Sequence, residues 1–415
     1  MSALSLHALS IDEQRDVLAY YYRSFAPDIS LASDTNLQNT FLAEAEPLTL
    51  YDLNGQPLFY DFSIQRPDGT PVGVVRSSAR GTEFPMLDAI MIGKQFFESA
   101  AARKAATEKV LTDYPHGVIK KTSFVCYGYP RVGILVQLEA DQKELSVVYD
   151  AAMGYRVKTW EGPFSSPEAG VLNKEDEPEG QPFYSYLEQV PERGSSSGLV
   201  GITGHWGSAV SLFERSNPSR LAAFAIAPIG KTHIPRPSIR GSFLPVPLFG
   251  QKTPVYCAVA TVQMILEYLG YEGHTQEQIA EAMETGPDGT TNAGMIRGFK
   301  KLTNNGWAQK LDNSPTFEKA ETYLAQAIPA KTGIPQHARL LRGWREYLFL
   351  DPDTSAISHT ERFYILNDPY PVDSGQFVME NVRKPTNDYF RNFLYPIRSQ
   401  ASDSNPIHPA NFVLD

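Results

Sequence analysis

A proline-rich segment divides the chain into two parts with different sequence patterns. Six prolines fall between residues 228 and 254 of the 415-residue chain. Proline fixes one backbone dihedral angle and lacks the N–H that helices and sheets use. Segments of this kind are typical of connections between domains. We therefore expect a boundary near residue 235, between an N-terminal domain of residues 1–235 and a second domain of residues 236–415.

The first part has the pattern of an α+β unit. Alternating apolar runs flank the dipeptides Asn54-Gly55 and Asp68-Gly69, which are strong signals of hairpin turns. Residues 10–24 and 93–112 have the composition of helices, and Ser10 suits the N-cap of the first one. Three further strands are expected at residues 122–129, 132–138 and 144–149.

The second part begins with helical periodicity and ends with strand patterns. Apolar residues recur at three- and four-residue spacing after Cys257, and Gly270 suits the cap that follows a helix. A capping-box pattern at Thr275 and Gln278 predicts a second helix over residues 275–285. Two more helices are expected near residue 292 and at 316–327, before strands that begin at His337 and Arg362. Helices first and strands later indicate two layers with a cleft between them.

Composition limits the classes of function. Hydrophobic residues make up 42% and charged residues 20% of the chain, as in ordinary globular proteins. The net charge of −10 argues against nucleic acid or an anionic membrane as the main partner.

The first residues lack the basic start and apolar core of a secretory signal, and no run suits a membrane helix. We expect a cytoplasmic location, unless a signal was removed or export is unconventional. Nothing in the sequence bears on the oligomeric state.

The chain has two cysteines, Cys126 and Cys257, which are too few for a disulfide framework or a cysteine-rich zinc site. No histidine pair has metal-ligand spacing, and no glycine-rich phosphate loop is present. No metal or cofactor is therefore expected. Cys126 alternates with Phe124 and Tyr127 in a strand pattern, which favours a small side chain packed in a sheet.

Cys257 is placed to act as a nucleophile. A thiol attacks a carbonyl as the thiolate, and a helix N-terminus and an imidazolium both lower its pKa. Pro254 halts any earlier helix, and the apolar periodicity begins directly after Cys257. Gln251 can fold back over the proline turn, so that its amide N–H₂ and the Cys257 backbone N–H stabilise an oxyanion. A buried core thiol is the alternative interpretation of Cys257.

Three histidines after Cys257 are candidate bases, with the terminal His408 set aside. His274 lies in a polar turn and His359 in a polar loop, whereas His337 heads a strand. His337 is best placed to face a cleft, and His359 stays a rival base. A strand over residues 362–366 then ends in Asn367-Asp368, either of which can accept the ring N–H of the histidine.

These motifs together resemble those of papain-like cysteine peptidases. They are, in chain order, Gln251, Cys257 at the start of a helix, His337-Ala338, Gly343-Trp344 and Asn367-Asp368-Pro369-Tyr370. The resemblance covers roughly residues 245–400 and is closest to the branch of bacteriocin-leader peptidase domains. It implies an α+β, two-part catalytic domain, with a helical part and an antiparallel sheet.

The resemblance also implies roles for individual residues. Cys257 would be the nucleophile, His337 the base and acid, and Gln251 the oxyanion donor. Asp368 corresponds to the aspartate of the leader peptidases, and Asn367 stays open because papain uses an asparagine. Two departures stand out. Papain has a glycine and a second cysteine around its nucleophile, whereas this chain has Ala258-Val259-Ala260. The 31 residues from His337 to Asp368 are more than the short hairpin that is usual in the family.

The function implied by the resemblance is a thiol peptidase that hydrolyses peptide or protein substrates through an acyl-enzyme. The alternatives are an acyltransferase or transglutaminase-like enzyme, and an inert papain-like scaffold used for binding.

The first part of the chain faintly resembles modules of bacterial protease propeptides. It would then make the protein a zymogen, with candidate cleavage sites in residues 190–240. A permanent domain that binds substrate or a partner is the other interpretation of residues 1–235.

Overall fold

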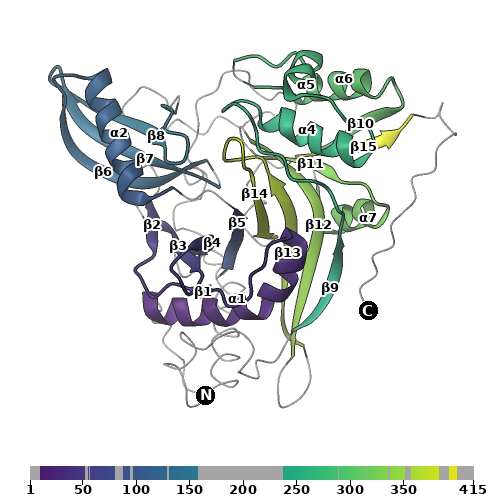
Figure 1. The fold of residues 1–415 in the computed structure, drawn as a ribbon, viewed down its shortest axis with the longest axis horizontal. Coiled ribbons are helices and arrows are strands. Elements are labelled where there is room, and N and C mark those ends of the chain that lie inside the picture. Colours follow the sequence, from purple (N-terminus) through teal and green to yellow (C-terminus); the bar gives the residue numbers. More distant parts are fainter. Residues whose placement is uncertain are drawn as a thin grey trace, which may run out of the picture.

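A computed structural model gives the fold of most of the chain. It describes residues 10–51, 55, 57–79, 87–93, 97–128, 130–157, 237–287, 289–313, 315–334, 337–350, 357–382 and 392–399. Within these residues, six helices and a 15-stranded sheet form a mixed structure that is consistent with the expected α+β class (Figure 1). Residues 190–236 of the candidate cleavage region 190–240 lie outside the described residues.

The described strands of residues 1–235, the N-terminal half, and of residues 236–415, the C-terminal half, belong to one sheet. They are β1 Phe41–Leu42, β2 Leu48–Tyr51, β3 Pro57–Gln65, β4 Pro71–Ser78, β5 Leu87–Gly93, β6 Val118–Gly128, β7 Arg131–Ala140, β8 Lys143–Asp150, β9 Ser238–Phe243, β10 Trp307–Asp312, β11 Ala330–Ile334, β12 His337–Leu350, β13 Ile357–Asp368, β14 Gln376–Asn381 and β15 Asn392–Arg398. Their order is β10-β15-β11-β12-β13-β14-β5-β4-β3-β2-β6-β7-β8, with β1 beside β3 and β9 beside β12. Nearly every pair is antiparallel, whereas β2 and β6 are parallel.

The junction between the halves is the pair β14 and β5. Gln376 opposes Gly93 and Glu380 opposes Ala89 in this antiparallel ladder. A sheet therefore runs without interruption from residues 87–93 to the strands that carry the predicted histidine and aspartate. The division of the chain near residue 235 stays a prediction, because that position lies outside the described residues.

The helices are α1 Ile11–Ser33, α2 Ser99–Asp113, α4 Cys257–Tyr268, α5 Gln276–Ala282, α6 Asn292–Leu302 and α7 Phe317–Ala325. The helix beginning at Cys257 is confirmed, and Gly270 follows it with a φ of 81° that favours glycine. The capping box of Thr275 and Gln278 is also present. The first helix is longer than predicted, because its apolar face continues beyond residue 24.

The continued face of α1 packs against strands of the second half. Phe25 is fully buried, and its ring lies 4.0 Å from that of Tyr347 on β12 and 5.6 Å from that of Phe363 on β13. Tyr21 meets Phe349 with ring centroids 5.1 Å apart. Each such aromatic burial contributes on the order of 1.5–3 kcal/mol. One hydrophobic core therefore includes side chains from both halves of the chain.

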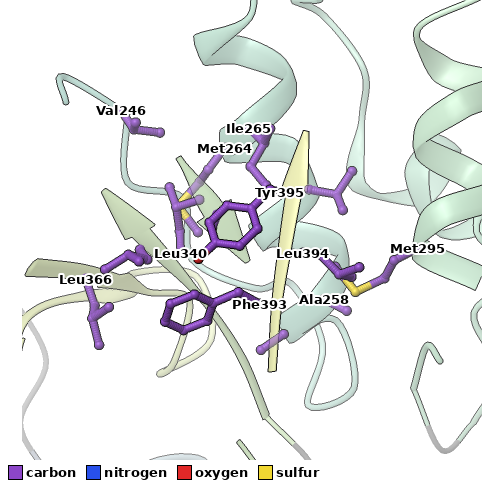
Figure 2. Close-up of a cluster of buried hydrophobic side chains, with 14 of the residues drawn as sticks. Val246, Ala258, Met264, Ile265, Met295, Leu340, Leu366, Phe393, Leu394 and Tyr395 are labelled. Carbon is purple, nitrogen blue, oxygen red and sulfur yellow. The ribbon is translucent and has the colours of Figure 1, made fainter. Parts of the chain in front are cut away.

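A second core supports the region around Cys257. Met264 and Ile265 of α4 are buried against Leu340 of β12, Leu366 of β13 and Phe393 of β15 (Figure 2). This packing holds α4, of which Cys257 is the first residue, against the sheet. It explains the apolar periodicity after Cys257, because that face of the helix covers the sheet.

The structure adds one strand that the sequence did not predict, and it corrects one local prediction. The proline-rich segment contains β9, which pairs with β12 from Ser238 to Phe243, since the prolines leave this stretch free to form an edge ladder. His359 belongs to β13 rather than to a polar loop, and it pairs with Phe349. Pairing with the long strand β12 overrides the polar composition around His359.

Candidate active site

Cys257 is the first residue of α4 and is half-buried. The preceding residue, Tyr256, is the N-cap and makes no side-chain hydrogen bond to the helix. The first helical hydrogen bond runs from the N–H of Ala260 to the carbonyl of Tyr256. The N–H groups of the first turn are therefore left without helical acceptors, next to the sulfur. These N–H groups form the positive end of the helix dipole, which favours a thiolate at this position.

His337 is the first residue of β12 and is 5% exposed. Leu340 of β12 opposes Asn367 of β13, so the start of β12 lies beside the end of β13. This register brings His337 to Asp368, and the distance from Nε2 to Oδ1 is 2.7 Å. The carboxylate accepts, so Nε2 carries the proton of this bond. The other ring nitrogen, Nδ1, is then the one available to Cys257, and the interaction between the two groups shifts both of their pKa values.

Asp368 and Asn367 have different partners, although they are neighbours in β13. The same Oδ1 of Asp368 accepts the backbone N–H of Tyr370 at 2.9 Å. Asn367 instead donates to the carbonyls of Val246 and Pro247, each at 3.1 Å. Successive strand residues point to opposite faces of the sheet. Asp368 is therefore the residue that contacts the histidine, and Asn367 holds the segment that leads to Gln251.

Gln251 is fixed by its backbone to the turn that follows Asp368. Its N–H donates to the carbonyl of Pro369 and its carbonyl accepts from Asp373, both at 2.9 Å. Gly250 permits this close approach, because a Cβ there would lie 2.4 Å from the carbonyl carbon of Asp373. The side chain of Gln251 is buried and donates to the carbonyl of Thr253 at 2.7 Å. Its role as oxyanion donor stays a prediction.

The surroundings of Cys257 favour the thiolate. Burial alone would raise the pKa of this thiol. Hydrogen bonds from His337 and from the backbone N–H of Ala338 act in the opposite direction, as do the charges of His337 and Arg131. These contributions outweigh burial, so the pKa of Cys257 lies below its ordinary value.

The surroundings of His337 favour the imidazolium. Burial alone would lower its pKa, but the charge and hydrogen bond of Asp368 and the interaction with Cys257 outweigh burial. The pKa of His337 is therefore raised above its ordinary value. A lowered thiol pKa beside a raised imidazole pKa is the condition for a thiolate–imidazolium pair.

The other sequence candidates lie elsewhere. His359 is nine residues before Asp368 in β13, which places it about 30 Å away at roughly 3.3 Å per residue. It is therefore not a rival base. Cys126 is 1% exposed and packs in the core of β6, β7 and β8, as predicted for a packed thiol.

Sequence reasoning missed a group of polar residues near Cys257. Arg131 of β7 lies over the ring of Tyr127, and the Tyr127 hydroxyl contacts Asp150 and Tyr155. The charge of Arg131 is one of the causes that lower the pKa of Cys257. Tyr370 joins them through a hydrogen bond to Asp150. Only Tyr370 stood in a sequence motif, because the others lie more than 100 residues before Cys257 and carry no local pattern.

A family model described as the Peptidase_C39 like family matches residues 243–393. The matched residues include Gln251, Cys257, His337 and Asp368. The match supports a papain-like cysteine peptidase family. No curated protein matches the chain. Within the part of the chain that the structure describes, no helix is long and apolar enough to cross a membrane.

Proposed function

We propose that the protein is a thiol peptidase that hydrolyses peptide bonds through an acyl-enzyme on Cys257. The observation that carries this proposal is the position of His337, whose Nε2 lies 2.7 Å from Asp368 Oδ1 and whose interaction with Cys257 shifts the pKa of both groups. A candidate nucleophile, base and orienting carboxylate thus act on one another at one site. This is the arrangement required for nucleophilic catalysis by a thiol.

The acylation step follows from the ion pair. The Cys257 thiolate attacks the substrate carbonyl, so that a C–S bond forms and the carbonyl electrons move to oxygen. His337 then gives its Nδ1 proton to the leaving amine as the C–N bond breaks. The products of this step are a free amine and a thioester on Cys257, with His337 neutral.

Deacylation reverses these roles. His337 takes a proton from water through Nδ1, and the resulting hydroxide equivalent attacks the thioester. The C–S bond then breaks, the peptide acid leaves and the thiolate–imidazolium pair is restored. Asp368 accepts the hydrogen bond of Nε2 throughout and keeps the proton on that nitrogen, which leaves Nδ1 free for the transfers.

Stabilisation of the oxyanion is assigned to the N-terminus of α4 and to Gln251. The backbone N–H of Cys257 belongs to the first helical turn and has no acceptor within the helix. Gln251 carries two side-chain N–H groups, of which the structure uses one for the carbonyl of Thr253. Its second N–H is available to a tetrahedral oxyanion at the substrate carbon.

The decisive experiment is the rate of alkylation of Cys257 as a function of pH, with peptide mass mapping of both cysteines. The His337→Ala variant is measured beside wild type, and Cys126 is the internal control because it is buried. In the wild type, we expect the Cys257 thiolate to form at a pH below the ordinary pKa of a thiol. In the variant, it should form at a pH nearer to that ordinary pKa. Identical profiles in both proteins, or equal labelling of Cys126, would contradict the proposal.

Hydrolysis is then separated from acyl transfer by the products. Peptide substrates are incubated with and without added amines, and the product masses are compared. Hydrolysis predicts a free carboxylate on the acyl fragment at every amine concentration. Accumulation of the amide adduct as the main product would show that an amine, rather than water, accepts the acyl group.

A further inference from the structure

The turn that follows Asp368 holds two parts of the candidate site. The backbone N–H of Tyr370 donates to Asp368 Oδ1 at 2.9 Å, and the same oxygen lies 2.7 Å from His337 Nε2. In this turn the carbonyl of Pro369 also accepts the backbone N–H of Gln251 at 2.9 Å. A displacement of the turn therefore moves both the carboxylate that orients the histidine and the segment that carries the candidate oxyanion donor.

The side chain of Tyr370 leads from this turn into the N-terminal half of the chain. It is buried, and its hydroxyl lies 3.3 and 3.2 Å from the two carboxylate oxygens of Asp150, the last residue of β8. Burial and the charge of Asp150 raise the pKa of the Tyr370 phenol, so the hydroxyl keeps its proton and donates. Tyr370 thus connects Asp368 to the N-terminal half through its backbone N–H on one side and its hydroxyl on the other.

Other donors hold the carboxylate of Asp150 in one position. It is 2% exposed, and Oδ2 accepts the hydroxyl of Tyr127 at 2.6 Å. The backbone N–H groups of Ala152 and Met153 donate to Oδ1 at 2.9 and 2.6 Å. A buried carboxylate is stable only where donors of this kind satisfy it, and they also fix its orientation. The N-terminal half therefore sets the position of the acceptor that Tyr370 meets.

Apolar packing joins the two halves again beside the histidine. Ile334 of β11 is the direct cross-strand partner of His337. It is buried and belongs to the same hydrophobic cluster as Phe124, Cys126 and Val132 of the N-terminal half. The strand pair that carries His337 thus shares a core with β6 and β7. Close packing of this kind resists a shift of one half against the other.

We propose that Asp150 is a positioning residue of the catalytic centre, which acts through the Tyr370 hydroxyl on the turn that holds Asp368. The N-terminal half is then a permanent part of the enzyme rather than a removable propeptide. This inference rests on the proposed thiol peptidase function. It gives Asp150 no step in the chemistry, because its role is to keep the imidazole of His337 aligned.

The attachment of the N-terminal half agrees with a permanent role. β5 pairs with β14, and α1 shares a hydrophobic core with β12 and β13. Asp28 of α1 also accepts from Arg345 at 2.7 Å and from Tyr347 at 2.9 Å. Removal of this half would expose a sheet edge and an apolar face, both of which are costly in water.

The test compares Tyr370→Phe with Tyr149→Phe as a matched control. Tyr149 is also buried, and its hydroxyl donates to Asp113 Oδ2 at 2.6 Å. Each variant therefore loses one hydrogen bond between a tyrosine and an aspartate. Successive residues of β8 point to opposite faces, so Tyr149 contacts the end of α2 whereas Asp150 contacts the turn after Asp368.

The readout is the rate of alkylation of Cys257 by iodoacetamide against pH, in the full chain, with thermal unfolding to confirm that each variant folds. We expect Tyr370→Phe to slow alkylation at acidic pH by roughly three- to tenfold, because a less well aligned imidazolium stabilises less thiolate. Tyr149→Phe should match wild type, although its melting temperature also falls. Equal profiles for Tyr370→Phe and wild type, or equal slowing in both variants, would overturn the role of Asp150.

Two substitutions of Asp150 separate its position from its charge. Asp150→Asn keeps a polar atom at each place, and a tyrosine hydroxyl can accept as well as donate, so this variant should keep most of the wild-type rate. Asp150→Ala removes the acceptor and should slow alkylation as Tyr370→Phe does. If Asp150→Asn is as slow as Tyr370→Phe, the charge of the carboxylate is responsible and the positioning role is wrong. If Asp150→Ala does not fold, Tyr370→Phe and Asp150→Asn still decide the question.

Failure of this inference differs from failure of the proposed function. An effect of His337→Ala without any effect of Tyr370→Phe would overturn the role of Asp150 alone. No effect of either variant on the alkylation profile would overturn the thiolate–imidazolium pair as well.

The permanent role is tested by cutting the chain once. A specific protease site is inserted in the run Gly194–Gly198, and the folded protein is cut there. We expect the two fragments to elute together in gel filtration, with the alkylation profile of the intact chain. Separation of the fragments with undiminished or faster alkylation of the C-terminal one would show that the N-terminal half does not position the site.

Discussion

His337 Nε2 lies 2.7 Å from Asp368 Oδ1, with both side chains almost fully buried. This contact fixes the tautomer of the imidazole and favours its charged form. We expect Asp368→Ala to lower kcat/KM by about 10²–10⁴, because the ring loses both orientation and charge. Asp368→Asn should be less damaging, since its amide oxygen still accepts the ring N–H. Rates over a range of pH measure both effects.

Asn367 provides the matched control for this prediction. Its side chain accepts from Arg342 at 2.8 Å and donates to the carbonyls of the 246–247 segment. Asn367→Ala should therefore lower stability by about 1–3 kcal/mol, because buried partners lose hydrogen bonds. It should leave the pH profile of the folded enzyme unchanged. A larger loss of rate in Asn367→Ala than in Asp368→Ala would mean that the triad assignment is wrong.

The pH dependence of kcat/KM follows from the two shifted pKa values. The thiolate is lost as the pH falls through the lowered pKa of Cys257, and the imidazolium is lost as the pH rises through the raised pKa of His337. We expect a bell-shaped profile with its plateau between these two pKa values. Asp368→Asn should move the alkaline limb to lower pH. A profile that only rises with pH would indicate a simple thiol instead of an ion pair.

The elements around Cys257 were predictable because their signals are local. Pro254, the apolar periodicity and Gly270 define the start and end of α4 within a short stretch of chain. The choice between Asn367 and Asp368 was not predictable in the same way. It depends on the register between β12 and β13, which no short sequence pattern specifies.

The contribution of the first half could not be predicted from local patterns at all. Tyr370 and Asp150 are 220 residues apart in the chain, and their hydrogen bond follows from the order of strands in the sheet. The same holds for β5 beside β14, which joins two segments that each look like ordinary strands. Likewise, β9 was not predicted, because its partner β12 lies far along the chain. The pairing is favourable because the prolines leave the backbone N–H groups of this stretch free for hydrogen bonds.

Gln251→Ala tests the assignment of the oxyanion donor. We expect kcat to fall by about 10²–10³, because the variant loses a hydrogen bond to the oxyanion that forms only in the transition state. Alkylation of Cys257 forms no tetrahedral oxyanion, so its pH profile should match wild type. Gln278→Ala is the control, since that glutamine is exposed and only caps α5. Equal losses of kcat and of alkylation rate in Gln251→Ala would mean that the side chain holds the loop rather than the oxyanion.

Asp28→Ala tests whether the N-terminal helix is part of the catalytic fold. Its carboxylate pairs with the buried Arg345 at 2.7 Å, and removal of one partner from such a pair costs about 3–5 kcal/mol. Asp12→Ala breaks the exposed pair with Arg15 and should cost at most about 1 kcal/mol. Urea unfolding is followed by the fluorescence of the tryptophans, of which Trp344 lies next to Arg345. If Asp28→Ala leaves this transition unchanged, α1 unfolds independently of the sheet that carries His337 and Asp368.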